Sequence, residues 1–405
     1  MAINTPKILD ILNAHGIVPE EHAQDLEFPE ISDIDEGETV YTTSITEVFR
    51  GDDEGGNNII AIDDGRIEEW WEEILQIMDG EQSARVRRIA RGPGDESVRP
   101  LEPHCAWYCP LHFFGHGWGI YIRESCILEY TKDIAAFINW HKVHASHSAI
   151  ARQLLSSAFY VFFLHEQFHH KVESLGFRLL ISTGKDRYRP YKTKVYRAAY
   201  LTRDCLEESL ANAESYRRLN ESRYMQRVEE PIRDGLRNFL RTTMPGQPPG
   251  YAEGVHYFPA ATYRNGLYKL QSQTLDSLLI PATPIEYWSV APNMITALTD
   301  ITDNIYVVLP QGARPIFHPT SVDPGATVST NALAGALTKH YGYQHVPGGK
   351  GSHVKLKKPG GQTIILPGNR PVLSPGVVKH ALDAVGGHPI SRLPDLLGGR
   401  LRSHG

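Results

Sequence analysis

A long stretch without proline or glycine, between Ser148 and Leu175, constrains the fold of this chain more than any other feature. The stretch is largely apolar, and this composition predicts one long, largely buried helix. Its middle carries the motif His-Glu-x-x-His, with His165, Glu166 and His169. Histidines four residues apart lie on one helix face, so both imidazoles can bind one metal. Because polar side chains on a buried helix need partners, the setting favours a metal site over a chance match.

A third metal ligand must come from another part of the chain, since a catalytic zinc commonly takes three protein ligands and keeps one position for water. The helical pattern at 198–219 offers Glu208, with Asn212 four residues later on the same face. Glu208 is the predicted ligand, and Asn212 is predicted to hydrogen-bond a ligand histidine. A solvated acidic helix face is the alternative for Glu208. The other acidic candidates are Glu207 as runner-up and, more distantly, Glu173 and Glu214.

Composition excludes several classes of protein. The 405 residues are enough for two or three domains, and the net charge of −6 gives no whole-chain signature of nucleic-acid binding. Four cysteines are too few for a disulfide framework. The first residues lack the apolar core of a signal peptide, and the run 158–164 is far short of a membrane span. These features predict a soluble, cytoplasmic protein with no membrane partner.

The predicted fold class is α+β, a mainly helical core with a small antiparallel sheet followed by a C-terminal α-β-β-β-α unit. Ordered pieces of the N-terminal region are predicted as helices at 8–15 and 66–78 and as a strand at 40–49. The strand predicted at 117–122, just before the long helix, is where an extended substrate would add to a sheet. The predicted domain boundaries are an acidic N-terminal region at 1–100, the core at 101–310, a linker at 311–330, the basic unit at 331–390 and a tail at 391–405.

Two further groups of histidines and cysteines are predicted to be structural. The spacing of the first group fits no strong zinc pattern, and buried residues of these types are commonly core. Its members are His104, Cys105, Cys109, His112 and His116. The second group recurs every third residue and is read as one face of a helix near the site. Its members are His141, His144 and His147.

The metal motif and the downstream pair Glu208 and Asn212 resemble the gluzincin metallopeptidases, over about residues 105–220. The resemblance implies a zincin-like core that hydrolyses protein or peptide substrates through a metal-activated water. It implies that Zn²⁺ is held by His165, His169 and Glu208. It also implies that Glu166 moves the proton to the leaving amine. Asn212 stands where the family often has aspartate, and 38 residues lie between His169 and Glu208, more than in thermolysin-like enzymes.

In gluzincins a tyrosine or histidine usually stabilises the oxyanion that forms from the scissile carbonyl. Tyr196 is the residue predicted for this role. Tyr191 and His170 are the alternatives.

The C-terminal region at 331–390 has seven Lys or Arg and one acidic residue, a balance that suits a phosphate backbone. Its predicted order is a helix at 332–341, strands at 343–346, 354–357 and 362–366, and a helix at 375–385. With Gly342-Tyr343, Gly351-Ser352-His353, Ile364-Ile365-Leu366-Pro367 and Leu373-Ser374-Pro375-Gly376, it resembles the HicA-type toxin domain, a small fold that cleaves messenger RNA. The resemblance implies RNA as a partner and His353 as the catalytic acid or base, with recognition alone as the alternative.

The function favoured by these features is a zinc metallopeptidase with a C-terminal nucleic-acid-binding or regulatory domain, in bacterial stress or phage defence. The alternative is a ribonuclease toxin of the toxin–antitoxin type that is regulated by an N-terminal metal-binding scaffold. A third reading is a zinc hydrolase that acts on something other than peptides. Cleavage specificity, the activation trigger and the oligomeric state are left open by the sequence.

Overall fold

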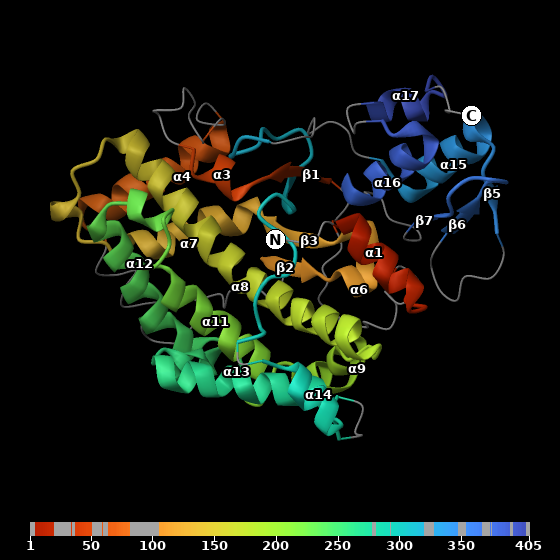
Figure 1. Cartoon of the computed structure of the whole chain (residues 1–405). Coiled ribbons are helices and arrows are strands. Elements are labelled where there is room, and N and C mark those ends of the chain that lie inside the picture. Colours follow the sequence, from red (N-terminus) through yellow and green to blue (C-terminus); the bar gives the residue numbers. More distant parts are fainter. Residues whose placement is uncertain are drawn as a thin grey trace.

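The computed structural model describes most of the chain (Figure 1). The described residues are 5–19, 34, 37–50, 59, 64–81, 105–277, 281–291, 293–319, 328–346, 354–366, 373, 375–388 and 392–401.

The larger sheet joins segments that are far apart in the sequence. Its four strands lie in the order β1-β4-β3-β2, with the following bounds: β1 Glu38–Thr43, β4 Ile305–Pro310, β3 Gly119–Arg123 and β2 Ala106–Cys109. β4 runs antiparallel to β1 and parallel to β3, and β3 runs antiparallel to β2. The sheet is therefore mixed rather than antiparallel as predicted, because β4 enters it next to β3 after a long helical excursion.

In the described part of the chain the edge strands of this sheet are β1 and β2, and not the strand predicted from the sequence. The strand predicted at 117–122 is β3, which has partners on both sides. The Arg123 amide donates to the Cys105 carbonyl at 2.8 Å, so these two residues form a hydrogen-bonded pair. From this pair onward, non-hydrogen-bonded and hydrogen-bonded residue pairs alternate along β2. By this alternation the backbone groups of Ala106 and Tyr108 point away from β3, toward the open edge. Substrate addition at β3 is therefore excluded, and the neighbour of β3 that has an open side among the described strands is β2.

The helix α8 (His147–Thr183) organises the rest of the molecule. The Ser146 hydroxyl accepts from the Ala149 amide at its start, and Gly184 ends it in a left-handed conformation. The helix confirms the prediction for the Pro-free and Gly-free stretch and continues past it. It packs against β2 and β3 on one side and against α7 and α11 on others (Figure 1), which explains its almost continuous burial.

Helices cover α8 on the side away from the sheet (Figure 1). The longer helices on this side are α11 Leu206–Arg218, α12 Glu230–Thr243 and α13 Ala260–Leu275, whereas α7 Glu124–Ala135 contacts α8 and also β3 and β4. The shorter helical segments of the larger part are α6 Leu111–Phe114, η4 Gly115–Gly117, η5 Trp140–Lys142, α9 Tyr188–Pro190, η6 Tyr191–Tyr196, α10 Arg197–Ala199, η7 Met225–Arg227, η8 Met244–Gly246, η9 Ala252–Tyr257 and α14 Pro284–Ser289.

The described part of the acidic N-terminal region belongs to the main core. The predicted helices are present as α1 (Thr5–Ala14) and α4 (Gly65–Gln76), which continues as η3 (Ile77–Glu81). The predicted strand at 40–49 is correct only as far as Thr43. Ser44 then caps the short helix α3 (Ile45–Val48). The core cluster includes Ile8, Tyr41 and Trp70 from this region together with residues of α7 and α8.

The C-terminal unit has a core of its own, made of residues between Val328 and Leu401. Its sheet is antiparallel in the order β5-β6-β7, and helix α16 also contacts β1 and η4 of the larger part. The elements are α15 Thr330–Tyr341, β5 Gln344–His345, β6 Val354–Lys357, β7 Ile364–Leu366, α16 Pro375–Gly386 and α17 Leu393–Leu397. Their order matches the predicted helix, three strands and helix. His353 and its loop at 348–353 lie outside the described residues.

The predicted linker at 311–330 contains buried residues. Ile316 and Phe317 lie in the main core, and residues 320–327 lie outside the described ranges. The domain boundaries themselves stay a prediction.

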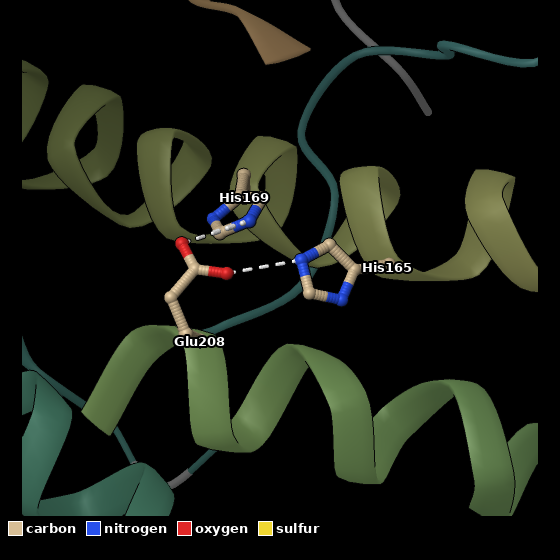
Figure 2. Close-up of side chains that lie close together, drawn as sticks. All are labelled: His165, His169 and Glu208. Carbon is tan, nitrogen blue, oxygen red and sulfur yellow. Dashed lines mark hydrogen bonds and ion pairs between the residues drawn. The ribbon is translucent and has the colours of Figure 1, made fainter. Parts of the chain in front are cut away.

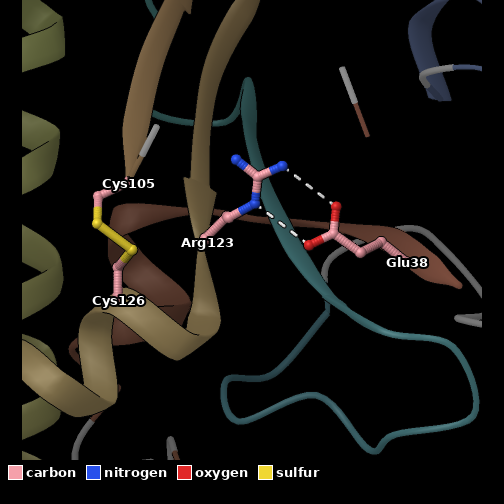
Figure 3. Close-up of a disulfide and its surroundings, with 4 residues drawn as sticks. All are labelled: Glu38, Cys105, Arg123 and Cys126. Atoms are coloured by element: carbon pink, nitrogen blue, oxygen red, sulfur yellow. Dashed lines mark hydrogen bonds and ion pairs between the residues drawn. A yellow bond between two sulfur atoms is a disulfide. The ribbon is translucent and has the colours of Figure 1, made fainter. Parts of the chain in front are cut away.

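A disulfide joins Cys105, at the start of β2, to Cys126 of α7 (Figure 3). It fastens the edge strand to a helix, and the cysteine count did not predict it. Next to it, Arg123 of β3 makes an ion pair with Glu38 of β1 at 3.2 Å across the sheet. Among the described residues, no helix combines the length and the apolar character needed to cross a membrane.

Candidate metal centre

Two histidines of α8 and one glutamate of α11 form a group that could hold a metal ion. The His165 Nε2 atom lies 3.0 Å from Glu208 Oε2, and the His169 Nε2 atom lies 3.5 Å from Glu208 Oε1. Figure 2 shows the Glu208 carboxylate facing both imidazoles from the neighbouring helix. The three ligand atoms lie within 4.8 Å of one another. The structure thus brings together the three residues that the sequence predicts as ligands.

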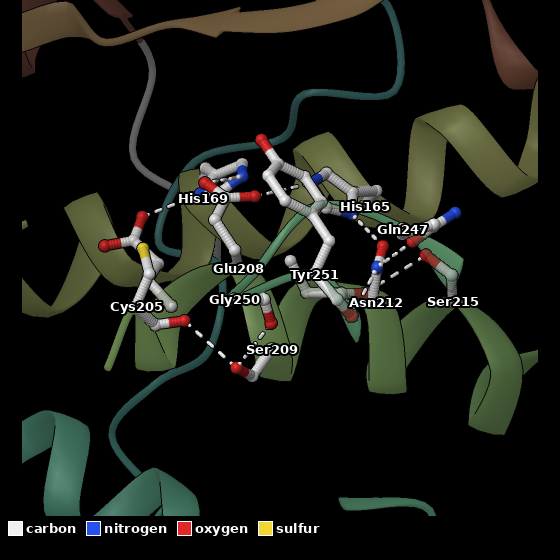
Figure 4. Close-up of polar contacts among 12 residues, drawn as sticks. His165, His169, Cys205, Glu208, Ser209, Asn212, Ser215, Gln247, Gly250 and Tyr251 are labelled. Carbon is white, nitrogen blue, oxygen red and sulfur yellow. Dashed lines mark hydrogen bonds and ion pairs between the residues drawn. The ribbon is translucent and has the colours of Figure 1, made fainter. Parts of the chain in front are cut away.

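The second nitrogen of each imidazole is held by another side chain of α11 (Figure 4). His165 Nδ1 lies 2.9 Å from Asn212 Oδ1, and His169 Nδ1 lies 2.6 Å from Glu207 Oε1. The Asn212 amide donates from Nδ2 to the Tyr251 carbonyl at 3.0 Å, which fixes its Oδ1 as an acceptor. Each Nδ1 therefore carries the proton, and in the neutral ring each Nε2 keeps a lone pair for a metal.

This donor set fits a catalytic zinc ion. Two imidazole nitrogens and one carboxylate oxygen are the three ligands that such sites provide, with one position left for water. Glu207, the runner-up ligand, is already engaged because its carboxylate receives hydrogen bonds from Tyr191 at 2.7 Å and Lys192 at 3.3 Å as well as from His169. Glu207 thus lies behind His169 and leaves Glu208 as the carboxylate that faces both Nε2 atoms.

The charges around this group attract a cation. Three buried carboxylates, those of Glu166, Glu207 and Glu208, are accompanied by the ammonium group of Lys192. Burial lowers the pKa of His169, but Glu208 and Glu207 outweigh burial and raise that pKa to about 10. In the absence of a metal, a protonated imidazole therefore supplies positive charge that a divalent ion would supply instead.

Glu166 lies beside the group and is almost fully buried, with 5% of its surface exposed. Burial raises the pKa of its carboxyl above the ordinary value, although His165 and His169 act in the opposite direction. A carboxyl group with a raised pKa accepts and returns a proton more readily near neutral pH. Glu166 also lines a pocket next to His165, so it is open to a bound molecule.

Tyr196, the residue predicted to stabilise an oxyanion, donates its hydroxyl hydrogen bond to Glu208. The Lys192 ammonium lies 3.3 Å from the centre of the Tyr196 ring. The two alternatives are engaged elsewhere: Tyr191 donates to Glu207, and His170 bonds the hydroxyl of Tyr108 at 2.9 Å. In this structure Tyr196 touches the candidate ligand itself rather than open space.

Tyr251 is a residue of this site that the sequence reasoning missed. Its ring is nearly parallel to the His165 ring, with centroids 5.8 Å apart, and it lines the same pocket (Figure 4). Burial raises the pKa of its hydroxyl well above the ordinary value, and the Glu208 carboxylate acts in the same direction. The residue follows the Pro-Gly loop at 246–250, and a tyrosine at this distance from the motif gives no local signal.

The remaining predicted candidates lie in other networks. The distant alternatives for the third ligand are paired: Glu173 accepts from the His112 amide at 2.8 Å, and Glu214 accepts from Lys171 at 2.6 Å. Cys105 is in the disulfide, while His104 and the side chain of His116 lie outside the described residues.

The second histidine group does not form one helix face. His141 lies in the turn η5, and α8 begins only at His147.

No family model matches the chain, and no curated protein and no solved structure is detectably similar to it.

Proposed function

We propose that the protein is a zinc-dependent peptidase whose metal is held by His165, His169 and Glu208. The observation that carries the proposal is the convergence of both Nε2 atoms on one carboxylate, with each Nδ1 atom fixed by a further side chain. A salt bridge that served only the fold would need neither a second imidazole on the same carboxylate nor the buried carboxyl of Glu166 beside the pair.

Each residue has a distinct role in this proposal. Zinc bound at the site supplies Lewis acidity, which acidifies water and polarises a carbonyl group. Glu166 accepts a proton from the attacking water and passes it to the leaving nitrogen. Tyr196 holds the Glu208 carboxylate in place through its hydrogen bond. Tyr251, whose ring extends along His165 at the pocket, is the group that we assign to donate to the carbonyl oxygen as charge builds up there.

The edge strand β2 supports a peptide as the substrate. The backbone groups of Ala106 and Tyr108 point away from β3, and Ala106 lines the pocket that also contains His165 and Glu166. An extended chain can add to such an edge by main-chain hydrogen bonds, which depend on the peptide backbone rather than on one side chain. Recognition of a peptide backbone at β2 would therefore lie next to the proposed chemistry.

The first experiment measures zinc by elemental analysis in the wild type, in His165→Ala and in Glu208→Ala. We expect about one zinc per chain in the wild type and a loss in both variants. Glu214→Gln is a matched control because it changes a buried glutamate of α11 that pairs with Lys171 instead. Zinc retained by Glu208→Ala, or absent from the reconstituted wild type, would refute the proposed ligand set.

The second experiment separates metal binding from catalysis. Glu166→Gln is expected to keep the zinc and to lose hydrolysis of an unfolded protein substrate by at least about 100-fold, in line with general acid–base catalysis. Hydrolysis that persists in the zinc-loaded Glu166→Gln protein would show that Glu166 is not the proton carrier.

The disulfide bears on where such an enzyme works. Disulfides persist in oxidising environments and are rare in the cytosol. We therefore propose an oxidising compartment in place of the cytoplasmic location expected from the sequence.

RNA cleavage with His353 as the catalytic acid or base is a second proposal, for the C-terminal unit alone. It is supported by the helix, three-stranded antiparallel sheet and helix order and by the excess of basic residues at 331–390. Replacing His353 by Ala in the full chain tests it: RNA cleavage should fall while RNA binding and peptidase activity stay. Unchanged RNA cleavage would remove the catalytic role from His353.

A further inference from the structure

We infer that the helix α14 binds the surface of an anionic lipid bilayer, with its apolar side chains inserted among the headgroups. The helix exposes Ile285, Tyr287 and Trp288, whose exposed fractions are 77%, 45% and 88%. These are three of the six large hydrophobic side chains that are exposed in the described part of the chain. Adjacent exposed apolar groups mark a surface that meets a partner or a membrane.

The polarity of α14 is the reverse of the pattern that a helix on a water-exposed surface shows. Its single charged residue, Glu286, is buried and makes ion pairs with Arg187 and Lys185. Ile285 and Trp288 are three residues apart, so they share one face of the helix, and this face is exposed. A surface helix normally buries its apolar face and exposes its charges. The exposed face of α14 therefore suits an apolar environment outside the protein.

Polar contacts fix α14 in this orientation. The Thr283 hydroxyl accepts from the Glu286 amide at 3.3 Å, and the Glu286 carboxylate accepts from the Thr283 amide at 2.7 Å, which together make a capping box. The Tyr287 hydroxyl donates to the carboxylate of Asp276, the residue after α13, at 3.1 Å. Turning α14 to hide Trp288 would break these contacts and bring the Glu286 ion pairs apart. The exposure of Trp288 is therefore part of the fold.

The segments around α14 are basic, although the chain as a whole has a net charge of −6. Residues 178–197 and 260–299 together contain nine Lys or Arg and three Asp or Glu. Lys185 is exposed, and Arg178 donates to the uncharged backbone carbonyls of Met294 and Thr296 at 2.9 and 2.6 Å. Anionic headgroups attract basic residues next to the membrane, and tryptophan and tyrosine prefer the headgroup region. An anionic bilayer therefore complements both the charge and the aromatic groups of this surface.

The size and position of this surface favour a bilayer over a protein partner. Figure 1 shows α14 at the lower edge of the molecule. Its three exposed side chains offer less than roughly 500 Å², whereas each partner of a stable protein complex buries about 800 Å². A bilayer accepts inserted side chains without a complementary surface of that size. The sequence-based expectation of no membrane partner considered spanning segments only, and binding at the surface needs none.

Flotation of the purified full-length chain with lipid vesicles tests the inference. Vesicles of phosphatidylcholine alone are compared with vesicles of equal parts phosphatidylcholine and phosphatidylglycerol. We expect the chain to bind the anionic vesicles at least about 10-fold more strongly than the neutral ones, and this binding should weaken as the salt concentration rises. Equal binding to both kinds of vesicle, or no binding to either, would overturn the inference.

Substitutions at Trp288 locate the contact. Trp288→Ser should weaken binding to anionic vesicles by at least about 10-fold, and Trp288→Phe should stay within about threefold of the wild type. Leu201→Ser is the matched control, because Leu201 is a large apolar residue outside α14 that is 40% exposed, and it should bind as the wild type does. Brominated lipid should quench more of the tryptophan emission of the wild type than of Trp288→Phe. Unchanged binding by Trp288→Ser would show that α14 does not insert.

A second copy of the chain as the partner gives a different result. Sedimentation without lipid would then show an assembly that dissociates in Trp288→Ser, and this outcome would overturn the inference. The metal group takes no part in lipid binding, so protein stripped of metal by a chelator should bind anionic vesicles as the zinc-loaded protein does. A peptidase function that fails therefore leaves the membrane contact standing, and the reverse also holds.

Discussion

Asn212 illustrates how one side chain outside the ligand set can determine metal affinity. Its amide oxygen holds His165 Nδ1 at 2.9 Å, and its amide nitrogen is fixed by Gln247 and by the Tyr251 carbonyl. Replacing Asn212 by Ala frees the imidazole to rotate and to change tautomer. We expect the zinc dissociation constant to rise about 10- to 100-fold, measured by competition with a chromophoric chelator.

A substitution at another buried residue of α11 provides the control for this prediction. Ser209 is also buried on α11, but its hydroxyl bonds the carbonyls of Cys205 and Gly250 and no imidazole (Figure 4). Ser209→Ala should therefore leave zinc affinity within about threefold of the wild type. Equal zinc affinities in Asn212→Ala and the wild type would mean that Asn212 does not orient His165.

Glu286 is a buried carboxylate that ties α14 to the segment after α8, and it predicts a pH dependence of stability. Burial opposes its ionisation, but Arg187, the Thr283 amide and Lys185 outweigh burial and lower its pKa to about 2. A group whose pKa is lower in the folded state stabilises the fold above the pKa of the unfolded chain, about 4.3, and loses this effect as pH falls toward 2.

Glu286→Gln isolates this effect. At pH 7 we expect the variant to be about 2 kcal/mol less stable than the wild type, as for other hydrogen bonds to charged groups. The difference in the free energy of unfolding, obtained from urea titrations, should shrink between about pH 5 and pH 3. A difference that is the same at pH 7 and pH 3 would argue against a salt-bridged, ionised Glu286.

At the residue scale, the predictable part of the candidate site is the part that local spacing encodes. His165 and His169 are four residues apart on one helix, with Glu166 between them. Glu208 and Asn212 are also four residues apart, on another helix. Tyr251 and the choice of Glu208 over Glu207 depend on how η9 and η6 pack against α8 and α11. No residue near Tyr251 signals that contact, because it arises only from tertiary packing.

At the scale of elements, α8 contains a glycine that its packing requires. A Cβ atom at Gly176 would lie 2.5 Å from the Cβ atom of Tyr188, a fully buried residue of α9. Gly176→Ala is therefore expected to destabilise the protein by about 1–3 kcal/mol, because the clash exceeds the gain in helix propensity. Gly335 of α15 has nothing within 4 Å, so Gly335→Ala should stabilise by up to about 1 kcal/mol.

Urea unfolding of both alanine variants measures the two effects with the same substitution. The opposite signs are the test: a stabilising Gly176→Ala would show that α9 does not pack against α8 as described. The comparison also shows that tertiary contacts can favour glycine at a helix position where propensity alone disfavours it.

The elements themselves were predictable to the extent that their signals are local. The composition of 148–175 was sufficient to predict most of α8, and the alternation at 117–122 was sufficient to predict most of β3. The end of β1 was missed although Ser44 and Glu47 carry the spacing of a helix start. The mixed sheet could not be predicted, because β4 pairs with β1 and β3 from the far end of the helical region, and nothing in its sequence specifies a partner.

At the scale of the whole molecule, the disulfide connects the two layers that bound the candidate site. Cys105 and Cys126 are 21 residues apart, and closing a loop of this size stabilises a fold by about 3 kcal/mol in the chain-entropy treatment. Cys126→Ser should lower the free energy of unfolding by about this amount under oxidising conditions. Cys109→Ser is the matched control, because Cys109 is a buried cysteine of β2 that takes no part in the disulfide.

Reduction distinguishes the loss of the crosslink from the loss of packing. With excess reductant in both samples, the wild type should fall to the stability of Cys126→Ser, whereas Cys109→Ser should respond to reductant as the wild type does. If reductant leaves the wild type unchanged, the two thiols are not joined in solution. The edge strand would then be held against α7 by packing alone, and the argument for an oxidising compartment would lose its basis, because that argument depends on this one bond.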